Sequence, residues 1–216
     1  MIKTKNSENI FLFIPNIIGY ARVILAIISF YFMKTHYVIA TSCYIISALL
    51  DAFDGHAARY FNQSTKFGAI LDQLTDRCGT MGLLVVLSNF YPTYLFWFQM
   101  VMIIDVACHW IYLHSSLLQG KTSHKFVDLS ENAIMRLYYT NKTILFFMCA
   151  TNELFFASLY LLNFTPGPMK IFKILTYATA PFMLIKNFIS LIQLFVACKN
   201  IGVIDVKERE SLGKND

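Results

Sequence analysis

The sequence predicts an all-α polytopic membrane protein with six transmembrane helices. Hydrophobic residues make up 56% of the 216-residue chain and charged residues only 14%, and the mean hydropathy is +0.53. An ordinary soluble domain with a polar shell is hard to build from this composition. Lys and Arg residues also gather in alternate connecting segments, which indicates a defined orientation in a membrane.

Six windows are long and apolar enough to cross a bilayer, which takes about 20 residues per helix. They are bounded by Lys, Arg, Pro or Asn clusters and cover residues 11–33, 37–58, 67–91, 94–118, 143–164 and 171–198. The first window has no small-residue cleavage site, so we expect a retained helix rather than a signal peptide. We expect a single transmembrane domain over residues 1–198 and a polar tail over residues 199–216.

The distribution of basic residues predicts the topology. They lie before the first window, after the second, after the fourth and in the tail: Lys3, Lys5, Arg59, Lys66, Lys121, Lys125, Arg136, Lys142, Lys199, Lys207, Arg209 and Lys214. The opposite connections hold only Lys34, Lys170 and Lys173. The positive-inside rule places the first set in the cytosol. An even number of spans then puts both termini on the cytosolic side.

Four acids interrupt the second and third windows: Asp51, Asp54, Asp72 and Asp76. Ionisable groups inside a bilayer are costly and mark functional sites by default. The first two acids are three residues apart and share a helix face, and the last two, four apart, share another. The short connection YFNQSTKF makes the two helices antiparallel neighbours. The two acidic faces can therefore meet near the cytosolic surface.

These carboxylates require cations, because Arg59 is the only basic side chain that we expect beside them and unpaired charges in a low dielectric are costly. Mg²⁺ and Mn²⁺ prefer oxygen ligands. Two such ions about 4 Å apart form the arrangement used for phosphoryl transfer. We therefore expect the four acids to bind two Mg²⁺ or Mn²⁺ ions.

The small and basic residues beside the acids indicate a phosphate ligand. Gly55 and Gly68 would let a phosphate or nucleotide approach the backbone, and Arg59 would offer it a forked donor. Each residue alone is better explained otherwise, the glycines by helix packing and the arginine by an interfacial position. Together with four acids in register, they favour phosphate binding.

The stretch 51–76 also resembles a known signature. It reads D-x-x-D-G-x-x-A-R, eight further residues, then G-x-x-x-D-x-x-x-D, and is similar at every specified position to the CDP-alcohol phosphatidyltransferase family. Segments such as ENIFLFIPNIIGYARVILAIISFYFM and SHKFVDLS resemble the animal phosphatidylinositol synthases within that family. The resemblance covers nearly the whole chain. It implies a six-helix bundle, usually a homodimer, with a polar cavity open to the cytosol in the endoplasmic reticulum membrane.

The same resemblance implies a reaction and the residues that perform it. The phosphatidyl group of CDP-diacylglycerol would be transferred to myo-inositol with release of CMP, at a membrane lipid surface and with no nucleic acid partner. Residues Asp51, Asp54 and Asp72 are similar to the family's metal ligands, and Asp76 to the residue that is both ligand and proton acceptor. Residues Gly55, Arg59 and Thr65 look like its CDP-diacylglycerol contacts.

Several polar residues have open roles. Candidates for selecting the alcohol are His114, Ser115, Ser116, Lys125 and Arg136. Asp105 and His109, at i and i+4, favour a mutually satisfied pair over a site role. Interhelical hydrogen bonding is the simpler interpretation of Asn152, Glu153 and Lys186. Arg22 could neutralise an acid or pair elsewhere within the bundle.

Three other functions stay open from sequence. The motif acts on the CDP half of the substrate, so serine, glycerol phosphate or another alcohol could be the acceptor. A divalent-cation transporter would explain the acids, but not the Gly and Arg positions; metal-dependent CMP release separates it from the enzyme. An isoprenoid-pyrophosphate enzyme ranks last, because its D-D-x-x-D repeats are absent from the sequence.

Overall fold

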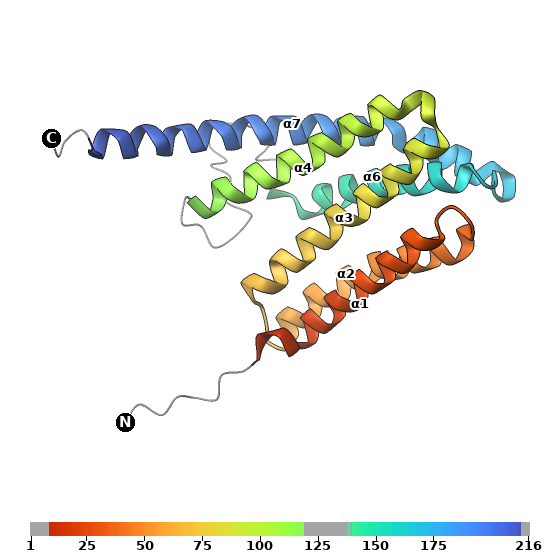
Figure 1. The fold of residues 1–216 in the computed structure, drawn as a ribbon, viewed down its shortest axis with the longest axis horizontal. Helices are drawn as coiled ribbons and strands as arrows, with labels where there is room; N and C mark the ends of the chain where they lie inside the picture. The colour runs from red at the N-terminus through yellow and green to blue at the C-terminus, as the bar shows by residue number, and fades with distance from the viewer. Residues whose placement is uncertain (1–8, 119–137, 139, 213–216) are drawn as a thin grey trace. The chain divides into compact units, whose positions relative to one another are not determined.

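The structure, a computed structural model, describes residues 9–118, 138 and 140–212. Its elements in chain order are η1 (Ile10–Leu12), α1 (Ile14–Phe32), α2 (Tyr37–Tyr60), α3 (Lys66–Phe90), η2 (Pro92–Tyr94), α4 (Leu95–Leu118), α6 (Lys142–Leu162), η3 (Pro168–Lys170) and α7 (Ile171–Leu212) (Figure 1). All the regular secondary structure among these residues is helical. The prediction of an all-α protein is confirmed.

Five of these helices, α1, α2, α4, α6 and α7, are long and apolar enough to cross a membrane. The prediction of a multi-pass membrane protein is therefore confirmed, but the count of six apolar spans is not exact. The remaining helix, α3, has 25 residues, which is sufficient length. Its charged residues, Lys66, Asp72, Asp76 and Arg77, keep it out of the apolar set.

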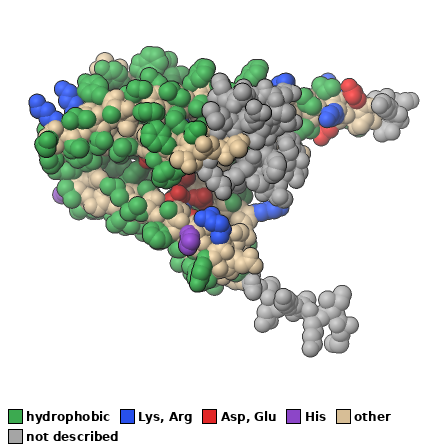
Figure 2. All heavy atoms as spheres, turned by 180° about the vertical axis from the view of Figure 1, so that it is seen from behind, with side chains coloured by type: hydrophobic (Ala, Val, Ile, Leu, Met, Phe, Trp, Pro, Cys, Tyr) green, Lys and Arg blue, Asp and Glu red, His purple; other side chains and the backbone are tan. Residues whose placement is uncertain are grey.

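The distribution of side chains is the reverse of that in a soluble protein. Asn16, Arg22 and Ser29 are buried along α1, whereas Ile24 and Ile27 on the same helix are largely exposed. The face in Figure 2 is mostly hydrophobic, with a few Asp and Glu side chains visible within it. Lipid covers exposed apolar side chains favourably, whereas polar groups need partners inside the protein.

The chain divides into two compact units, Met1–Val86 and Leu87–Asp216. In the first unit α1 packs along α2. The Ser29 hydroxyl donates to the backbone carbonyl of Ala40 at 2.8 Å, and the Ser47 hydroxyl donates to that of Arg22 at 3.1 Å. These two buried bonds fix the register of α1 against the helix that carries Asp51 and Asp54.

Helix α3 approaches α1 closely where either helix has a glycine. A Cβ at the glycine would lie under 3.0 Å from its neighbour in three pairs: Gly19 with Leu71, Gly68 with Asn16, and Gly82 with Phe30. The partners are separated by 52 residues in each pair, as 71 minus 19 shows, so the two helices run parallel. This packing holds the acids of α3 next to α1.

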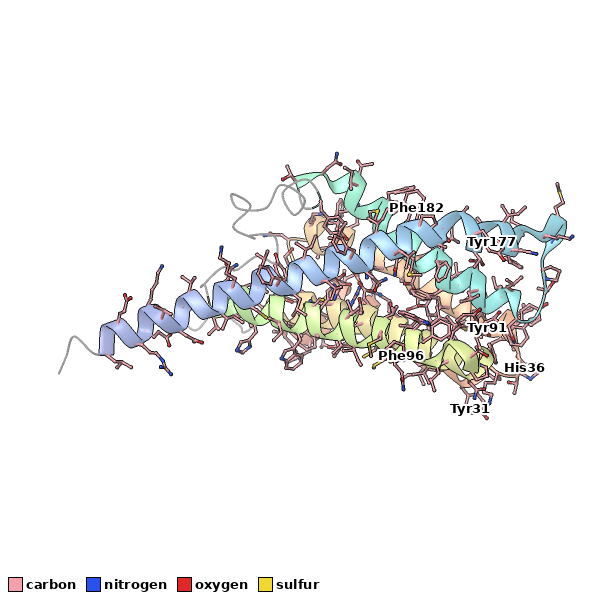
Figure 3. All side chains as sticks on the ribbon, turned by 90° about the horizontal axis from the view of Figure 1, so that it is seen from above. Tyr31, His36, Tyr91, Phe96, Tyr177 and Phe182 are labelled. Carbon is pink, nitrogen blue, oxygen red and sulfur yellow. The ribbon has the colours of Figure 1, made fainter. Side chains whose placement is uncertain are left out.

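In the second unit α7 packs against both α4 and α6. Its core includes Tyr112, Met148 and Ile189. Phe182 of α7, labelled in Figure 3, meets Phe147 of α6 edge to face at 5.1 Å between ring centroids. Helix α7 has 42 residues and continues to Leu212, so the expected polar tail is helical over residues 199–212.

Candidate active site and metal centre

The four acids of the motif meet around one side chain of α1, Arg22. Its Nη1 donates to Asp54 Oδ2 at 2.6 Å and to Asp72 Oδ1 at 2.7 Å. Its Nη2 lies 2.6 Å from both Asp51 Oδ1 and Asp76 Oδ1. Each nitrogen therefore joins one acid of α2 to one acid of α3. The acidic faces of α2 and α3 therefore lie opposite each other, as the sequence predicts.

The pairing of the acids follows from helix direction. Helix α2 runs from Asp51 to Asp54 while α3 runs from Asp72 to Asp76, and the first acid of α2 shares a nitrogen with the last acid of α3. That cross-pairing is the one expected of antiparallel neighbours with acids one turn apart on each helix. The α2–α3 connection also contacts the start of α1, where Gln63 Oε1 accepts from the backbone N–H of Ile14 at 3.0 Å.

The expectation that Arg59 is the only cation beside the acids is wrong. Arg22 contacts all four acids, and Arg77 Nη2 lies 3.9 Å from Asp76 Oδ2. The cause is tertiary packing, since Arg22 reaches the acids from a helix at least 29 residues away, 51 minus 22. Of the two roles that the sequence left open for Arg22, the structure shows the neutralisation of acids; the sequence signal is that Arg22 is the only charged residue in the window 11–33.

The acids differ in accessibility. The Arg22 side chain is only 2% exposed and that of Asp54 10%, whereas those of Asp51, Asp72 and Asp76 are between 37% and 45% exposed. Asp54 therefore lies at the buried end of the cluster. The other three acids present oxygens that a ligand can reach.

Three of the acids fit a hard divalent cation. Asp51, Asp72 and Asp76 each offer a carboxylate oxygen, and these oxygens lie within 4.8 Å of one another. The presence of the Arg22 guanidinium among them shows that the cluster accommodates a cation. An all-oxygen, anionic donor set is typical of Mg²⁺ or Mn²⁺ sites. Asp54, also expected as a ligand, is not in this group of three.

The other motif residues lie at the helix ends that face the α2–α3 connection. Arg59 is exposed in the last turn of α2, and its Nη1 lies 3.6 Å from where a Cβ on Gly55 would be. Thr65 precedes α3, and its Oγ1 accepts from the backbone N–H of Gly68 at 2.9 Å. Thr65 thus caps α3. Capping fixes the start of the helix that carries two of the acids.

Asn16 is a site neighbour that sequence reasoning missed. It is buried on α1, and its Nδ2 donates to the backbone carbonyl of Ile10 at 2.6 Å. Its Oδ1 is buried and has no hydrogen-bond partner among the described residues. The Pro15-Asn16 pair at the start of the helix was visible in the sequence, but its closeness to Gly68 depends on how α1 and α3 pack.

The comparisons with known proteins agree with this site. A sequence profile described as CDP-alcohol phosphatidyltransferase matches residues 12–197, which include the four acids and Arg22. The chain belongs to the CDP-alcohol phosphatidyltransferase family. No solved structure matches it.

Curated relatives within this family are similar over nearly their whole length. The CDP-diacylglycerol–inositol 3-phosphatidyltransferase of Drosophila melanogaster is 56% identical over 207 residues, covering 94% of this chain and 91% of the relative. The enzymes of the same name from Mus musculus and Homo sapiens are each 53% identical over 206 residues, covering 94% of this chain and 97% of each relative.

This CDP-alcohol phosphatidyltransferase has a second buried charge cluster, within the Leu87–Asp216 unit. The Lys186 ammonium of α7 donates to Asp105 Oδ1 of α4 at 3.2 Å. His109 is one turn from Asp105, and its Nδ1 lies 2.7 Å from the Asp105 carbonyl oxygen and 3.6 Å from Oδ1. The expected Asp105–His109 pairing is thus joined by Lys186, which the sequence did not connect to it.

The candidates for selecting the alcohol are only partly visible. Ser115 and Ser116 are buried on α4, and His114 between Leu113 and Ser115 is exposed. Lys125 and Arg136 lie outside the described residues. The selection of the alcohol by these residues stays a prediction.

Proposed function

We propose that this chain transfers the phosphatidyl group of CDP-diacylglycerol to inositol, giving phosphatidylinositol and CMP. The observation that supports this best is the 53–56% identity to enzymes named for that reaction over 94% of the chain. The pyrophosphate of the donor lipid is anionic and needs concentrated positive charge. The four converging acids can bind the cations that supply this charge.

In the proposed reaction an inositol hydroxyl oxygen forms a bond to the phosphorus that carries diacylglycerol. The bond from that phosphorus to the oxygen of the CMP phosphate breaks, and CMP leaves with the electron pair. The hydroxyl proton is accepted by Asp76, whose carboxylate is accessible and lies one turn beyond Asp72. Asp76 is the proposed catalytic residue.

The metal centre of the proposal consists of Asp51, Asp54, Asp72 and Asp76, holding two Mg²⁺ or Mn²⁺ ions. The family generally depends on divalent metals, and the acid cluster of this chain offers the oxygen ligands that they prefer. When bound, the metal supplies positive charge that offsets the charge on the leaving phosphate. We propose that Asp51, Asp72 and Asp76 contact the substrate-bound metal, because their side chains are the accessible ones.

We assign the CDP-diacylglycerol headgroup to Gly55, Arg59 and Thr65. The Arg59 guanidinium lies beside Gly55, with Nη1 3.6 Å from where a Cβ on Gly55 would be. Arg59 is exposed, and its guanidinium can form forked bonds to phosphate. The Thr65 hydroxyl caps α3 through its acceptor oxygen, so its hydrogen remains able to donate to a phosphate oxygen.

The cellular setting is part of the proposal. The acyl chains of the donor stay in lipid while its headgroup meets inositol at the acids. We propose an endoplasmic reticulum location, both termini in the cytosol and a homodimer, on the basis of family membership and the positions of the basic residues.

The test uses the purified full-length chain with CDP-diacylglycerol, Mg²⁺ or Mn²⁺, and inositol, serine or glycerol phosphate in parallel. We expect CMP release that depends on metal and on inositol, with phosphatidylinositol as the lipid product. Transfer to serine or glycerol phosphate instead would overturn the acceptor, and no CMP release with any alcohol would overturn the reaction. Full turnover by an Asp76→Asn variant would show that Asp76 is not the proton acceptor.

A further inference from the structure

Arg22 is the centre of the acid cluster. Its two terminal nitrogens lie 2.6–2.7 Å from one oxygen of each of the four acids, which is the distance of a charge-assisted hydrogen bond. The guanidinium therefore uses an oxygen of every carboxylate that the proposed metal would bind. A divalent cation at these carboxylates either displaces the guanidinium or binds the second oxygen of each carboxylate beside it, against the repulsion of its positive charge.

The guanidinium is not fully satisfied where it lies. Arg22 is 2% exposed, and its Nε is buried with no hydrogen-bond partner among the described residues. A buried arginine with a purely structural role normally has its donors paired. The surroundings of Arg22 therefore favour its charge but leave its hydrogen bonding incomplete.

We propose that Arg22 is a positioning residue that acts as the internal counter-ion of the metal centre. Before metal binds, it holds the four carboxylates of α2 and α3 together against their mutual repulsion. When metal binds, Arg22 competes with it for the carboxylate oxygens and so sets the metal affinity. This inference rests on the proposed function only in that divalent metal binds at these acids.

The planar fork of arginine explains why this residue type occupies the centre. Nη1 joins Asp54 to Asp72, and Nη2 joins Asp51 to Asp76, so one side chain holds both cross-helix pairs. A lysine ammonium is a compact point charge and cannot span the two pairs in this way. It would keep the full positive charge but contact fewer of the four carboxylates, and so compete less strongly with a metal ion for their oxygens.

The test measures metal binding without substrate. Full-length wild type, Arg22→Met, Arg22→Lys and Lys186→Met are purified in detergent and titrated with Mn²⁺, with free Mn²⁺ followed by electron paramagnetic resonance. Thermal unfolding is recorded with EDTA and with Mn²⁺. Lys186→Met is the matched control, because it removes a buried cation from Asp105, an acid outside the cluster.

We expect Arg22→Met to bind Mn²⁺ about tenfold or more tightly than wild type, since a positive charge in contact with the ligands is gone. Its unfolding temperature should be lower in EDTA and rise further on adding Mn²⁺ than that of wild type. Arg22→Lys should fall between the two in affinity. Lys186→Met should unfold at a lower temperature with unchanged Mn²⁺ affinity.

An unchanged or weaker Mn²⁺ affinity in folded Arg22→Met overturns the proposal, because Arg22 would then only be a scaffold for the ligands. If Arg22→Met does not fold, Arg22→Lys decides in the same way: an affinity no tighter than that of wild type overturns it. Absence of Mn²⁺ binding in every variant overturns it as well. Failure of the proposed reaction appears separately, as missing CMP release in the activity assay.

Discussion

Gly68 lies where α3 approaches α1 most tightly near the acids. A Cβ at this position would be 2.7 Å from Asn16 Oδ1 and 3.1 Å from Thr65 Oγ1. Both neighbours are constrained, the first by burial and the second by its capping bond. Of the two roles that the sequence left open for this glycine, helix packing and phosphate access, the close approach supports packing.

We predict that Gly68→Ala lowers the free energy of unfolding by about 1–3 kcal/mol, the usual cost of overpacking a tight site. It should also lower turnover, because α3 carries Asp72 and Asp76. Unfolding of the purified protein in detergent measures the first effect and CMP release the second. Gly202→Ala is the control: it lies inside α7 with nothing within 4 Å of an added Cβ and should be neutral or slightly stabilising. Equal behaviour of the two variants would contradict the packing argument.

Asp54 and Asp51 allow a second test at the residue scale. Both accept from Arg22, but the side chain of Asp54 is 10% exposed and that of Asp51 43%. Loss of a charged acceptor costs more where water cannot replace it. We predict that Asp54→Asn lowers the unfolding temperature in EDTA more than Asp51→Asn does. A larger loss for Asp51→Asn would show that burial does not rank these acids.

The acids and Arg22 differ in how far the sequence determines their positions. Spacing of three and four residues within two adjacent helices sufficed to predict that Asp51 and Asp54 face Asp72 and Asp76, because helical periodicity and a short connection determine that contact. The position of Arg22 depends instead on how α1 packs, which local periodicity does not encode. Its cross-bridging of both pairs was therefore not predictable.

The boundaries of the predicted windows agree with those of the helices to within a few residues, except at the C-terminus of α7. Apolar windows end where charges begin, at Lys199, but the helix continues to Leu212. Hydropathy reports the part of a helix that lipid can cover and not its hydrogen-bonded length. The same distinction explains α3, a full-length helix whose acids lower its hydropathy.

Helices α4 and α7 are joined by the buried Lys186–Asp105 ion pair. The ammonium donates at 3.2 Å, and both side chains are at most 10% exposed. Removing one partner of a buried pair costs about 3–5 kcal/mol, while replacing both is often neutral. We predict a loss of that size for Lys186→Met and recovery of most of it in the double variant with Asp105→Asn. Thermal unfolding of wild type, both single variants and the double variant measures the coupling; additive losses would contradict it.

The topology of the whole chain depends on whether α3 crosses the membrane. Its composition excludes it from the five apolar helices, yet its 25 residues are long enough to span. The basic residues of the neighbouring turns help to decide. Arg59 and Lys66 flank the α2–α3 turn, whereas the turn between α3 and α4, residues 91–94, contains no Lys or Arg. The positive-inside rule favours opposite sides for the two turns, and α3 must then cross.

We therefore predict that the chain has six spans and that both termini lie on the cytosolic side, where an odd number of spans would separate them. The measurement uses the full-length chain with an epitope tag at each end, in sealed microsomes. Added protease should remove both tags without detergent, and a cysteine placed in the 91–94 turn should react with an impermeant maleimide only after detergent is added. One protected tag would mean an odd number of spans. A cysteine in the 91–94 turn that reacts in sealed vesicles would show that α3 does not cross the membrane and that both its ends lie on the cytosolic side.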